Sequence, residues 1–410
     1  MTSTLLFYIL IFILIANFLW DSFVNALNAK HFNDIIPSEL NGIYNDEEYS
    51  KSQKYKLVNY KFSLITSLFS ITITLLFFLF DGFAFVDEIA KNSTSNTILV
   101  TLIFFGIILF GSNLLSLPFS YYKTFVIEEQ FGFNKTTLKT FIFDKLKGWI
   151  IMIVVGGGLL ALITVFYEKT AHLFWLYAWA LITIISLFIT FFYSRFIVPI
   201  FNKQTVLEEG ELKVAIESFA VKTGFKLNNV YVIDGSKRST KANAYFSGFG
   251  SQKRITLYDT LIKDLETDEV VAVLAHEIGH YKEKHVIYNL VLSTISMGFT
   301  LFILSLLVGS SMLSEALGVA STSFHIGLIA FSILYSPISE ITGLFMNSLS
   351  RKFEYEADNF AKNNFGAEPL ITSLKKLSKN SLSNLTPHPF YVKMNYSHPT
   401  LFQRIKNLKK

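Results

Sequence analysis

Residues 267–309 read TDEVVAVLAHEIGHYKEKHVIYNLVLSTISMGFTLFILSLLVG and join a polar segment directly to an apolar one. Thr267 is a favourable N-cap, and the two acids after it suit the positive end of a helix dipole, so a helix is predicted to begin here. Positions four apart on a helix lie about 40° apart around the axis and one turn along it. His276 and His280 are therefore predicted to bind one metal ion from a single face of this helix.

Glu277, between these histidines, is the predicted general base. It lies about 100° round the helix from His276, beside the ion, where its carboxylate is placed to take a proton from water. A helix end that merely contains two histidines is the alternative, but three of the eight histidines fall between 276 and 285. His285 lies about 140° round from His280, and it is predicted to face elsewhere as an interfacial residue and not a ligand.

Zinc suits imidazole ligands, and a catalytic zinc site takes a third protein ligand while the fourth position stays open. The third ligand is expected from a second helix, the acidic segment RKFEYEADNFA at 351–361. Glu354 and Asp358 share a face there, whereas Glu356 points roughly 200° away from Glu354. One acid would bind the ion while the other fixes the tautomer of a ligand histidine. The spacing leaves open which does which, and a solvated acidic face is the alternative.

The composition of the chain is strongly apolar. Of 410 residues, 51% are hydrophobic and 16% are charged, against roughly 25% charged in an average soluble domain. The absence of cysteine excludes thiolate chemistry and a disulfide framework. The net charge of +5 is small for this length, so a lipid bilayer and not a nucleic acid is the predicted partner.

Seven stretches are apolar and long enough to cross a bilayer, which takes about 20 residues. They are residues 4–20, 62–85, 97–119, 148–166, 171–193, 286–309 and 325–346. Cytoplasmic loops of membrane proteins carry an excess of lysine and arginine. The loops of this chain follow that rule if the N-terminus lies outside, and seven spans then place the C-terminus inside. Glu340 in the last span is expected either to face a buried partner or wet cavity, or to reach the headgroups.

Several motifs together resemble a known family. His276-Glu-Ile-Gly-His280 with Glu354-Tyr-Glu-Ala-Asp358 looks like the paired signature of the membrane-integral gluzincin proteases called CAAX prenyl endopeptidases. Further matches are Ala242-Asn-Ala-Tyr-Phe246, Arg254-Ile-Thr-Leu-Tyr-Asp259, Glu128-Glu-Gln-Phe-Gly-Phe-Asn134, and Ser397-His-Pro-Thr400 with Arg404. The matches span nearly the whole chain. The shorter HtpX-type membrane proteases are also similar, but they have fewer spans and fit this length less well.

The resemblance implies a role for each matching residue. For the metal, one zinc ion per chain, it implies His276, His280 and Glu354. For catalysis it implies Glu277 as general base, Asp358 as the partner of a ligand histidine, His398 as oxyanion stabiliser and Arg404 as the residue that orders this part of the site. For the substrate it implies Asn243 and Ala244, on an edge strand that pairs with an extended peptide. From the sequence alone, His398 next to a proline is as well explained as a turn residue.

The expected fold is an all-α, seven-span membrane protein with a mostly helical, zincin-like cytoplasmic metalloprotease domain. A small β element is expected in it, because Asn229–Ile233 and Arg254–Leu257 have β-like sequences. The resemblance also implies a chamber between the spans with the zinc at its inside wall. The expected division is 1–193 for five spans, 194–285 for the first part of the protease domain, 286–346 for two spans and 347–410 for the second part.

The predicted activity is peptide-bond hydrolysis by zinc-activated water, on a peptide or protein substrate. The resemblance implies removal of the last three residues from a protein whose C-terminal cysteine is prenylated. A quality-control protease of HtpX type is an alternative, as are a transporter or channel with a structural metal and a non-catalytic scaffold. A chain with 42 phenylalanines and only 8 prolines indicates an AT-rich bacterial genome and hence a bacterial inner membrane, whereas eukaryotic relatives occupy the endoplasmic reticulum.

Overall fold

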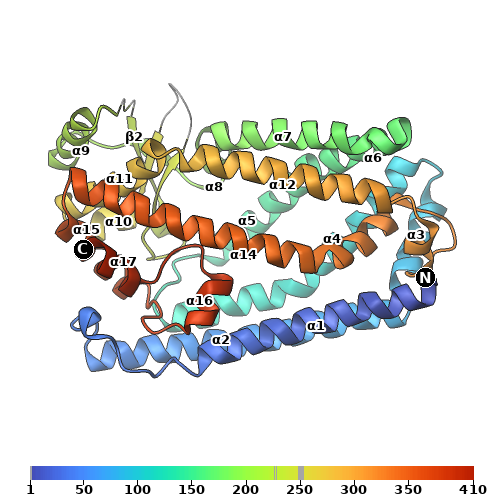
Figure 1. The fold of residues 1–410 in the computed structure, drawn as a ribbon, viewed down its shortest axis with the longest axis horizontal. Helices are drawn as coiled ribbons and strands as arrows, with labels where there is room; N and C mark the ends of the chain where they lie inside the picture. The colour runs from blue at the N-terminus through green and yellow to red at the C-terminus, as the bar shows by residue number, and fades with distance from the viewer. Residues whose placement is uncertain (1, 226, 228, 248–253) are drawn as a thin grey trace.

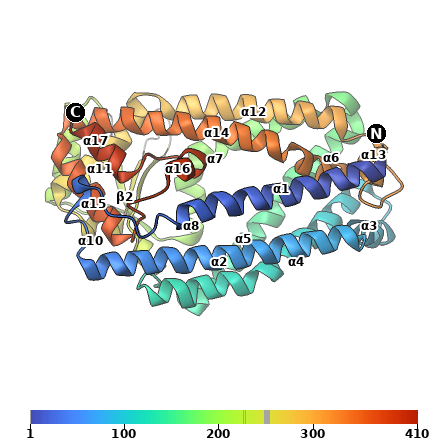
Figure 2. The ribbon, with the colours of Figure 1, turned by 60° about the horizontal axis from the view of Figure 1, so that its bottom comes forward.

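The computed structural model describes residues 2–225, 227, 229–247 and 254–410. Long helices run side by side along the molecule, and short helices with a small sheet gather at one end (Figures 1 and 2). The C-terminus lies at this end, and the N-terminus lies at the opposite one. The polar and the apolar parts of the sequence are thus separated along the long axis.

Six continuous helical stretches among the described residues are long and apolar enough to cross a membrane. They are Ser3–Ala29 (α1), Asp46–Leu79 (α2), Thr97–Glu128 (with α4, Thr97–Tyr122), Leu138–Phe201 (with α5, Leu138–Ile151, and with α6 and α7), His285–Leu307 (α12) and Phe324–Asn364 (α14). In their most apolar windows only 6–17% of the residues are buried, so most of these apolar side chains face outward. Apolar helices that leave their side chains unburied are stable in lipid and not in water.

The fourth stretch contains two crossings. Its 64 residues are interrupted at Ala171, where φ is 44°. The chain reverses here, because α6 (Gly158–Thr170) and α7 (Phe174–Phe192) pack on each other, with the rings of Phe166 and Tyr177 5.6 Å apart. Helical segments therefore account for all seven predicted spans, and the protein is an integral, multi-pass membrane protein.

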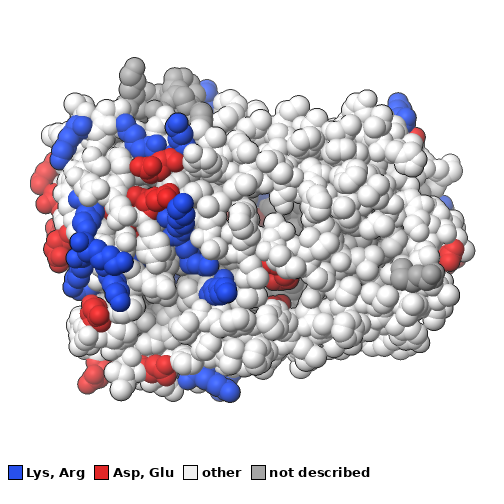
Figure 3. All heavy atoms as spheres, in the orientation of Figure 1, with Lys and Arg blue, Asp and Glu red and all other residues white. Residues whose placement is uncertain are grey.

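The surface of the molecule shows the same division. Lysine, arginine, aspartate and glutamate crowd the end that carries the sheet, and most of the remaining surface in this view is uncharged (Figure 3). The middle of this face is hollowed, with acidic atoms visible inside the hollow. Glu340 on α14 is exposed and has no ion-pair partner among the described residues, so it lacks the buried partner that was one expectation for it.

Two predicted spans differ from the helices that contain them. The stretch 62–85 passes the end of α2, because Asp81 adopts φ 52° and the chain turns into the short helix α3 (Gly82–Ser93). The span 325–346 is the first half of α14, whose 41 residues continue without a break into the segment with Glu354 and Asp358. One continuous helix therefore runs from the far end of the membrane region to the predicted metal site.

The sheet has the strand order β1-β2-β4-β3. Its strands are β1 (Gln204–Val206), β2 (Asn229–Ile233), β4 (Arg254–Tyr258) and β3 (Ala244–Ser247). The two segments with β-like sequences are β2 and β4, which pair in parallel, and β3 lies antiparallel to β4 at the edge. One apolar core contains residues of the strands together with Ile216 and Leu274 of the first polar block and Leu370 and Ile405 of the second.

A buried contact between a histidine and a carboxylate closes the opposite end of the molecule. His325, at the start of α14, approaches Asp87 of α3 with Nε2 and Oδ1 2.7 Å apart, and both residues are buried. Lys91 contacts the other oxygen of Asp87 at 2.7 Å. Phe104 packs against the His325 ring with centroids 4.6 Å apart. This contact fastens α3 to the first turn of α14.

We expect Asp87→Ala to destabilise the protein, because it leaves the His325 ring buried without its acceptor. Removal of one partner of a buried pair costs about 3–5 kcal/mol. The midpoint of thermal unfolding in detergent should therefore fall. Glu88→Ala is the matched control, since Glu88 is the next residue and is exposed; equal midpoints for the two variants would contradict the assignment.

Candidate active site

The helix α11 (Thr267–Lys282) carries both histidines of the sequence motif and is buried at the centre of the polar end. Its N-cap is Glu266 and not the predicted Thr267. The Glu266 side chain accepts a hydrogen bond from the third residue of the helix, and Glu269 accepts one from the Glu266 amide at 2.8 Å. This reciprocal pair of acidic caps satisfies two free amides and suits the helix dipole, so Thr267 is not needed as the cap.

Gly279 allows α11 to approach α14 closely. A Cβ atom at this position would lie 3.0 Å from the Ala357 Cα and 3.1 Å from the Ala357 carbonyl oxygen. A larger residue would therefore push the two helices apart. Because the histidines sit on α11 and the acids on α14, this contact brings the predicted ligands within reach of one another.

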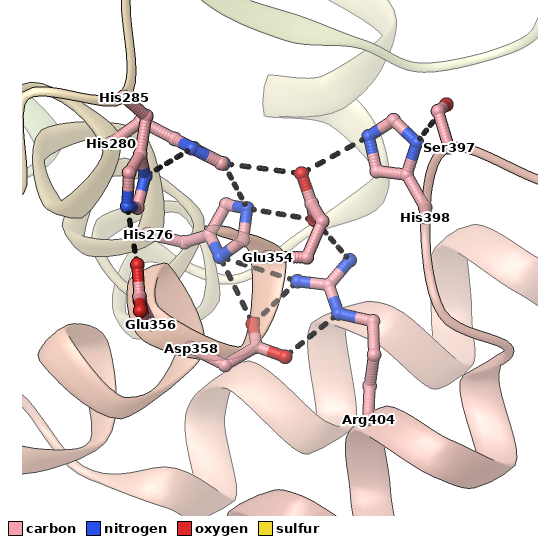
Figure 4. Close-up of polar contacts among 9 residues, drawn as sticks. All are labelled: His276, His280, His285, Glu354, Glu356, Asp358, Ser397, His398 and Arg404. Carbon is pink, nitrogen blue, oxygen red and sulfur yellow. Dashed lines mark hydrogen bonds and ion pairs between the residues drawn. The ribbon is translucent and has the colours of Figure 1, made fainter. Parts of the chain in front are cut away.

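Two histidines and one acid converge where these helices meet (Figure 4). Nε2 of His276 lies 3.4 Å from Oε2 of Glu354, and Nε2 of His280 lies 3.2 Å from its Oε1. The two histidine Nε2 atoms are 3.2 Å apart. Ligand atoms about 2.1 Å from a tetrahedral ion lie about 3.4 Å from one another. The three side chains therefore have the separations of metal ligands.

Asp358, supported by Arg404, orients the His276 ring from the side that faces away from the metal cluster. The Nδ1 atom of His276 lies 2.9 Å from Oδ1 of the fully buried Asp358, to which it donates its proton. Arg404 on α17 (Leu401–Leu408) donates to both oxygens of Asp358, at 2.6 and 2.9 Å. With the proton on Nδ1, Nε2 of His276 presents its lone pair to the cluster. The structure thus places Glu354, and not Asp358, among the metal-facing groups.

His285 holds the second histidine, and the prediction that it faces elsewhere as an interfacial residue is wrong. It is 2% exposed, and its Nδ1 lies 3.0 Å from Nδ1 of His280. Helical geometry does not apply between these residues, because Lys284 adopts φ 61° and the chain turns into α12. The side chain of His285 therefore folds back onto α11.

The contacts of His285 continue to Glu356 on α14. Nε2 of His285 lies 2.9 Å from Oε2 of Glu356, and the ring stacks on Phe353 with centroids 4.2 Å apart. With its proton on Nε2 donated to Glu356, His285 accepts at Nδ1 from His280, whose Nε2 then faces the cluster with its lone pair. His285 and Glu356 are positioning residues that the helix spacing missed. The third histidine so close behind the motif was a sequence signal that could have identified His285.

The residues present fit a metal ion. Oε2 of Glu354 is buried and has no hydrogen-bond donor, and the histidine protons are turned away from the cluster. Three acceptors that face one another repel unless a cation lies between them. Burial and the charge of Arg404 lower the pKa of His276, but the nearby carboxylates of Asp358 and Glu354 outweigh them and raise it to about 9. The same preference for positive charge suits a divalent metal, and imidazole with carboxylate is a common donor set for one.

Glu277 lies beside this cluster with its carboxylate free. It is half-buried, and among the described residues it has no hydrogen-bond or ion-pair partner. Burial raises the pKa of the Glu277 carboxyl above its usual value. A carboxylate with a raised pKa is a stronger base than an ordinary one, which suits it to accept a proton near neutral pH.

His398 stands at the open side of the cluster, on the other side of Glu354 from His280 (Figure 4). Its Nε2 lies 3.3 Å from Oε1 of Glu354, and its Nδ1 lies 2.9 Å from the Ser397 hydroxyl. The side chain is 64% exposed, so a substrate can reach it. The loop that carries it leads into α17, which also brings Arg404 to within 3.6 Å of Glu354.

Asn243 and Ala244 lie at the sheet edge and outside the metal cluster. Ala244 is the first residue of β3, and the exposed Asn243 precedes it and accepts a hydrogen bond from the Tyr258 amide at 3.1 Å. No further strand pairs with β3 among the described residues, and β3 contacts α11. The free edge therefore runs beside the helix that carries the histidines.

The segment before β3 is fastened to the membrane region. Lys241 contacts Glu128 with Nζ and Oε2 2.9 Å apart, and the Tyr55 hydroxyl donates to the other oxygen of Glu128 at 2.6 Å. Glu128 opens the motif 128–134 of the sequence, which follows α4. The role of this motif in the structure is thus to fix the edge strand relative to α2 and α4.

Known proteins resemble the chain over nearly its full length. Residues 25–203 match the family "CAAX prenyl protease N-terminal, five membrane helices", and residues 206–410 match "Peptidase family M48". The CAAX prenyl protease 1 homologue of Oryza sativa is 36% identical, with 91% of this chain and 90% of the relative covered. The human homologue is 33% identical, with 96% and 93% covered. The crystal structure of S. mikatae Ste24p matches with a TM-score of 0.94 at 32% identity, over 99% of both chains.

The fold and the site define an integral-membrane metallopeptidase. More closely, the chain belongs to the CAAX prenyl protease family within peptidase family M48.

We expect His285→Ala to weaken metal binding about 10- to 100-fold, the usual effect of removing a partner that orients a metal-bound histidine. The reason is that His280 loses the acceptor that holds its Nδ1 proton. Metal affinity is measured by competition with a chelating dye. Lys352→Ala is the control, because Lys352 contacts Glu356 from an exposed position. Equal affinity of the His285 variant and the parent would show that His285 only fills space.

Proposed function

We propose that this chain is a zinc endopeptidase that removes the C-terminal tripeptide from proteins whose C-terminal cysteine is prenylated. The observation that carries the proposal is the convergence of His276, His280 and Glu354 beside the unpartnered carboxylate of Glu277. The substrate class is taken from the names of the relatives, CAAX prenyl protease 1 and its homologues, which span nearly the whole chain.

In the proposal, His276, His280 and Glu354 hold one zinc ion per chain. The chemistry that zinc supplies in such a site is a lower pKa of water, from 15.7 to about 7, and polarisation of a carbonyl. Asp358 with Arg404 and His285 with Glu356 keep both imidazoles in the tautomer that can bind the ion. The alternative that the chain is a structural zinc protein is not favoured, because such sites close all four positions with protein ligands.

The remaining roles belong to residues round the cluster. Glu277 accepts a proton from the attacking water and passes it to the leaving amine nitrogen. His398 donates a hydrogen bond to the oxyanion that forms from the scissile carbonyl. Asn243 and Ala244 present the free edge of the sheet, to which an extended peptide adds as a further strand. Their position beside α11 is the support for this assignment.

The orientation in the membrane follows from charge. We propose that the N-terminus lies outside and the C-terminus inside, because the charged end of the molecule contains the site and cytoplasmic loops collect lysine and arginine. Residues 194–285 and 347–410 then form one protease domain in the cytoplasm. Their shared apolar core supports this division, with 1–193 and 286–346 as the membrane parts. The composition supports a bacterial inner membrane as the location.

The other function classes are not favoured. Relatives that cover more than nine-tenths of this chain are named as CAAX prenyl proteases and not as transporters or channels. The catalytic carboxylate of Glu277 is present, whereas a scaffold descended from a protease has no need of it. A broader quality-control role of HtpX type would appear as cleavage of membrane proteins that carry no prenyl group.

We expect Glu277→Gln to abolish cleavage of a farnesylated CAAX peptide while the metal content stays at one equivalent. Loss of a general base typically lowers the rate about 10²- to 10⁴-fold. Products are followed by mass spectrometry, and zinc by elemental analysis. Glu283→Gln is the matched control, because this exposed acid caps the same helix. A Glu277 variant that cleaves as well as the parent would end the enzymatic assignment.

We expect His398→Ala to lower kcat about 10²- to 10³-fold with little change in KM, since an oxyanion donor acts mainly in the transition state. Steady-state kinetics on the same peptide give both constants. Lys393→Ala, at an exposed residue of the same segment, serves as control. A rise in KM alone would instead assign His398 to ground-state binding.

A further inference from the structure

A cavity of about 710 Å³ opens beside the metal cluster. One wall contains His398 and Arg404, the two residues next to Glu354. The lining also includes Asn28 of α1, Lys56 of α2 and Asn384 of a loop near the C-terminus. Ligand pockets of proteins commonly enclose about 300–1,000 Å³, so this cavity is of the size that holds a small ligand or a short peptide.

The charges on the cavity wall are all of one sign. No aspartate or glutamate is among its lining residues, whereas Lys56 and Arg404 are. The charge of Arg404 is compensated, because both oxygens of Asp358 accept from its guanidinium. The positive charge of Lys56 is therefore the one on the cavity wall that no carboxylate compensates.

Lys56 is held as a buried cation without a counter-ion. It is 8% exposed, and its Nζ donates to Oδ1 of Asn384 at 3.3 Å. The rings of Phe32 and Tyr49 each lie 5.6 Å from Nζ. No carboxylate lies within ion-pair distance of Lys56 among the described residues. A buried charge without an opposite charge is costly, and an anion in the cavity would offset that cost.

We propose that this cavity receives the C-terminal end of the substrate peptide and that Lys56 binds its terminal carboxylate. This inference rests on the proposed function, which supplies a peptide cut near its C-terminus. An extended tripeptide is about 10–11 Å long, and a sphere of 710 Å³ is about 11 Å across. A scissile bond at the cluster and a terminal carboxylate at Lys56 therefore fit within one cavity. By binding the terminal carboxylate, Lys56 then fixes how many residues lie between the end of the substrate and the bond that is cleaved.

The neighbouring groups suit this ligand. Serine, asparagine and tyrosine side chains make up most of the remaining wall, so polar groups line the path of a peptide backbone. Asn384 is fixed between Lys56 and Asn28, with its Nδ2 3.5 Å from Oδ1 of Asn28. Asn28 in turn accepts from the His388 amide at 3.1 Å. Lys56 is thus anchored on one side and accessible from the cavity.

The test compares one farnesylated peptide with a free C-terminal carboxylate and the same peptide with a C-terminal amide. We expect the parent enzyme to favour the free acid in kcat/KM by on the order of tenfold or more, the usual worth of a charge-assisted hydrogen bond. Lys56→Met and Lys56→Gln should remove most of this preference, and Lys56→Arg should retain it. Lys54→Met is the matched control and should leave the preference unchanged, because Lys54 is exposed on the same helix.

A third peptide distinguishes binding of the terminal carboxylate from binding of a side-chain carboxylate. It has an amidated C-terminus and an aspartate as its last residue; cleavage of this peptide as efficient as that of the free acid would overturn the assignment to the terminal carboxylate. The proposal also fails if the parent shows no preference for the free acid, or if the preference survives in a folded, zinc-loaded Lys56→Met or Lys56→Gln variant. The parent measurement and the Lys56→Arg variant keep the test decisive if a neutral variant does not fold.

Failure of this inference is distinguishable from failure of the proposed function. If the parent cleaves neither the acid nor the amide, the endopeptidase assignment itself is wrong. The same holds if the Glu277→Gln variant cleaves them as well as the parent does. If cleavage depends on Glu277 but the ratio of acid to amide does not depend on Lys56, only the carboxylate site is wrong.

Discussion

The close contact between α11 and α14 is the constraint on which the site depends. The histidines lie on one helix and the acid on the other, so a metal site exists only where the two backbones approach. Gly279 removes the Cβ that would meet Ala357 at 3.0 Å. The contact is supported by apolar burial along α11 and by a core that draws on both polar blocks. Since α14 continues into the membrane as one helix of 41 residues, the same contact also fixes the site relative to the bilayer.

A buried polar network on this scale is stable only when each group has its partner. Asp358 is fully buried, yet it accepts from His276 and from two nitrogens of Arg404. His285 is nearly as deeply buried and lies between His280 and Glu356. The groups left without a donor are those that face the cluster, such as Oε2 of Glu354. Within this network the unpaired oxygen therefore lies where a cation can bind, and the pairs on the far side fix the cluster in place.

The cavity beside the cluster extends this division of charge toward the substrate. Its wall carries the uncompensated cation Lys56 and no acid, in a region otherwise rich in hydroxyl and amide groups. The edge strand β3 lies beside α11 and is held by the contact of Lys241 with Glu128. A free strand edge, a cluster of metal-ligand residues and a cationic cavity thus all lie at the charged end of the molecule. In our proposal each of them recognises a different part of a peptide: its backbone, its scissile bond and its end.

The sequence by itself determined the spans, the pair His276 and His280, and the shared face of Glu354 and Asp358. These features depend on local composition and on helix periodicity, which need no knowledge of distant contacts. Which of the two acids faces the metal cluster was decided only by tertiary structure. Glu354 and Asp358 are one turn of α14 apart, and the position of α11 determines which of them lies beside the two histidine Nε2 atoms. The contact of His285 with His280 was also decided there. Lys284, with φ 61°, breaks the helix between them, so spacing along the chain no longer gave the direction of the side chain.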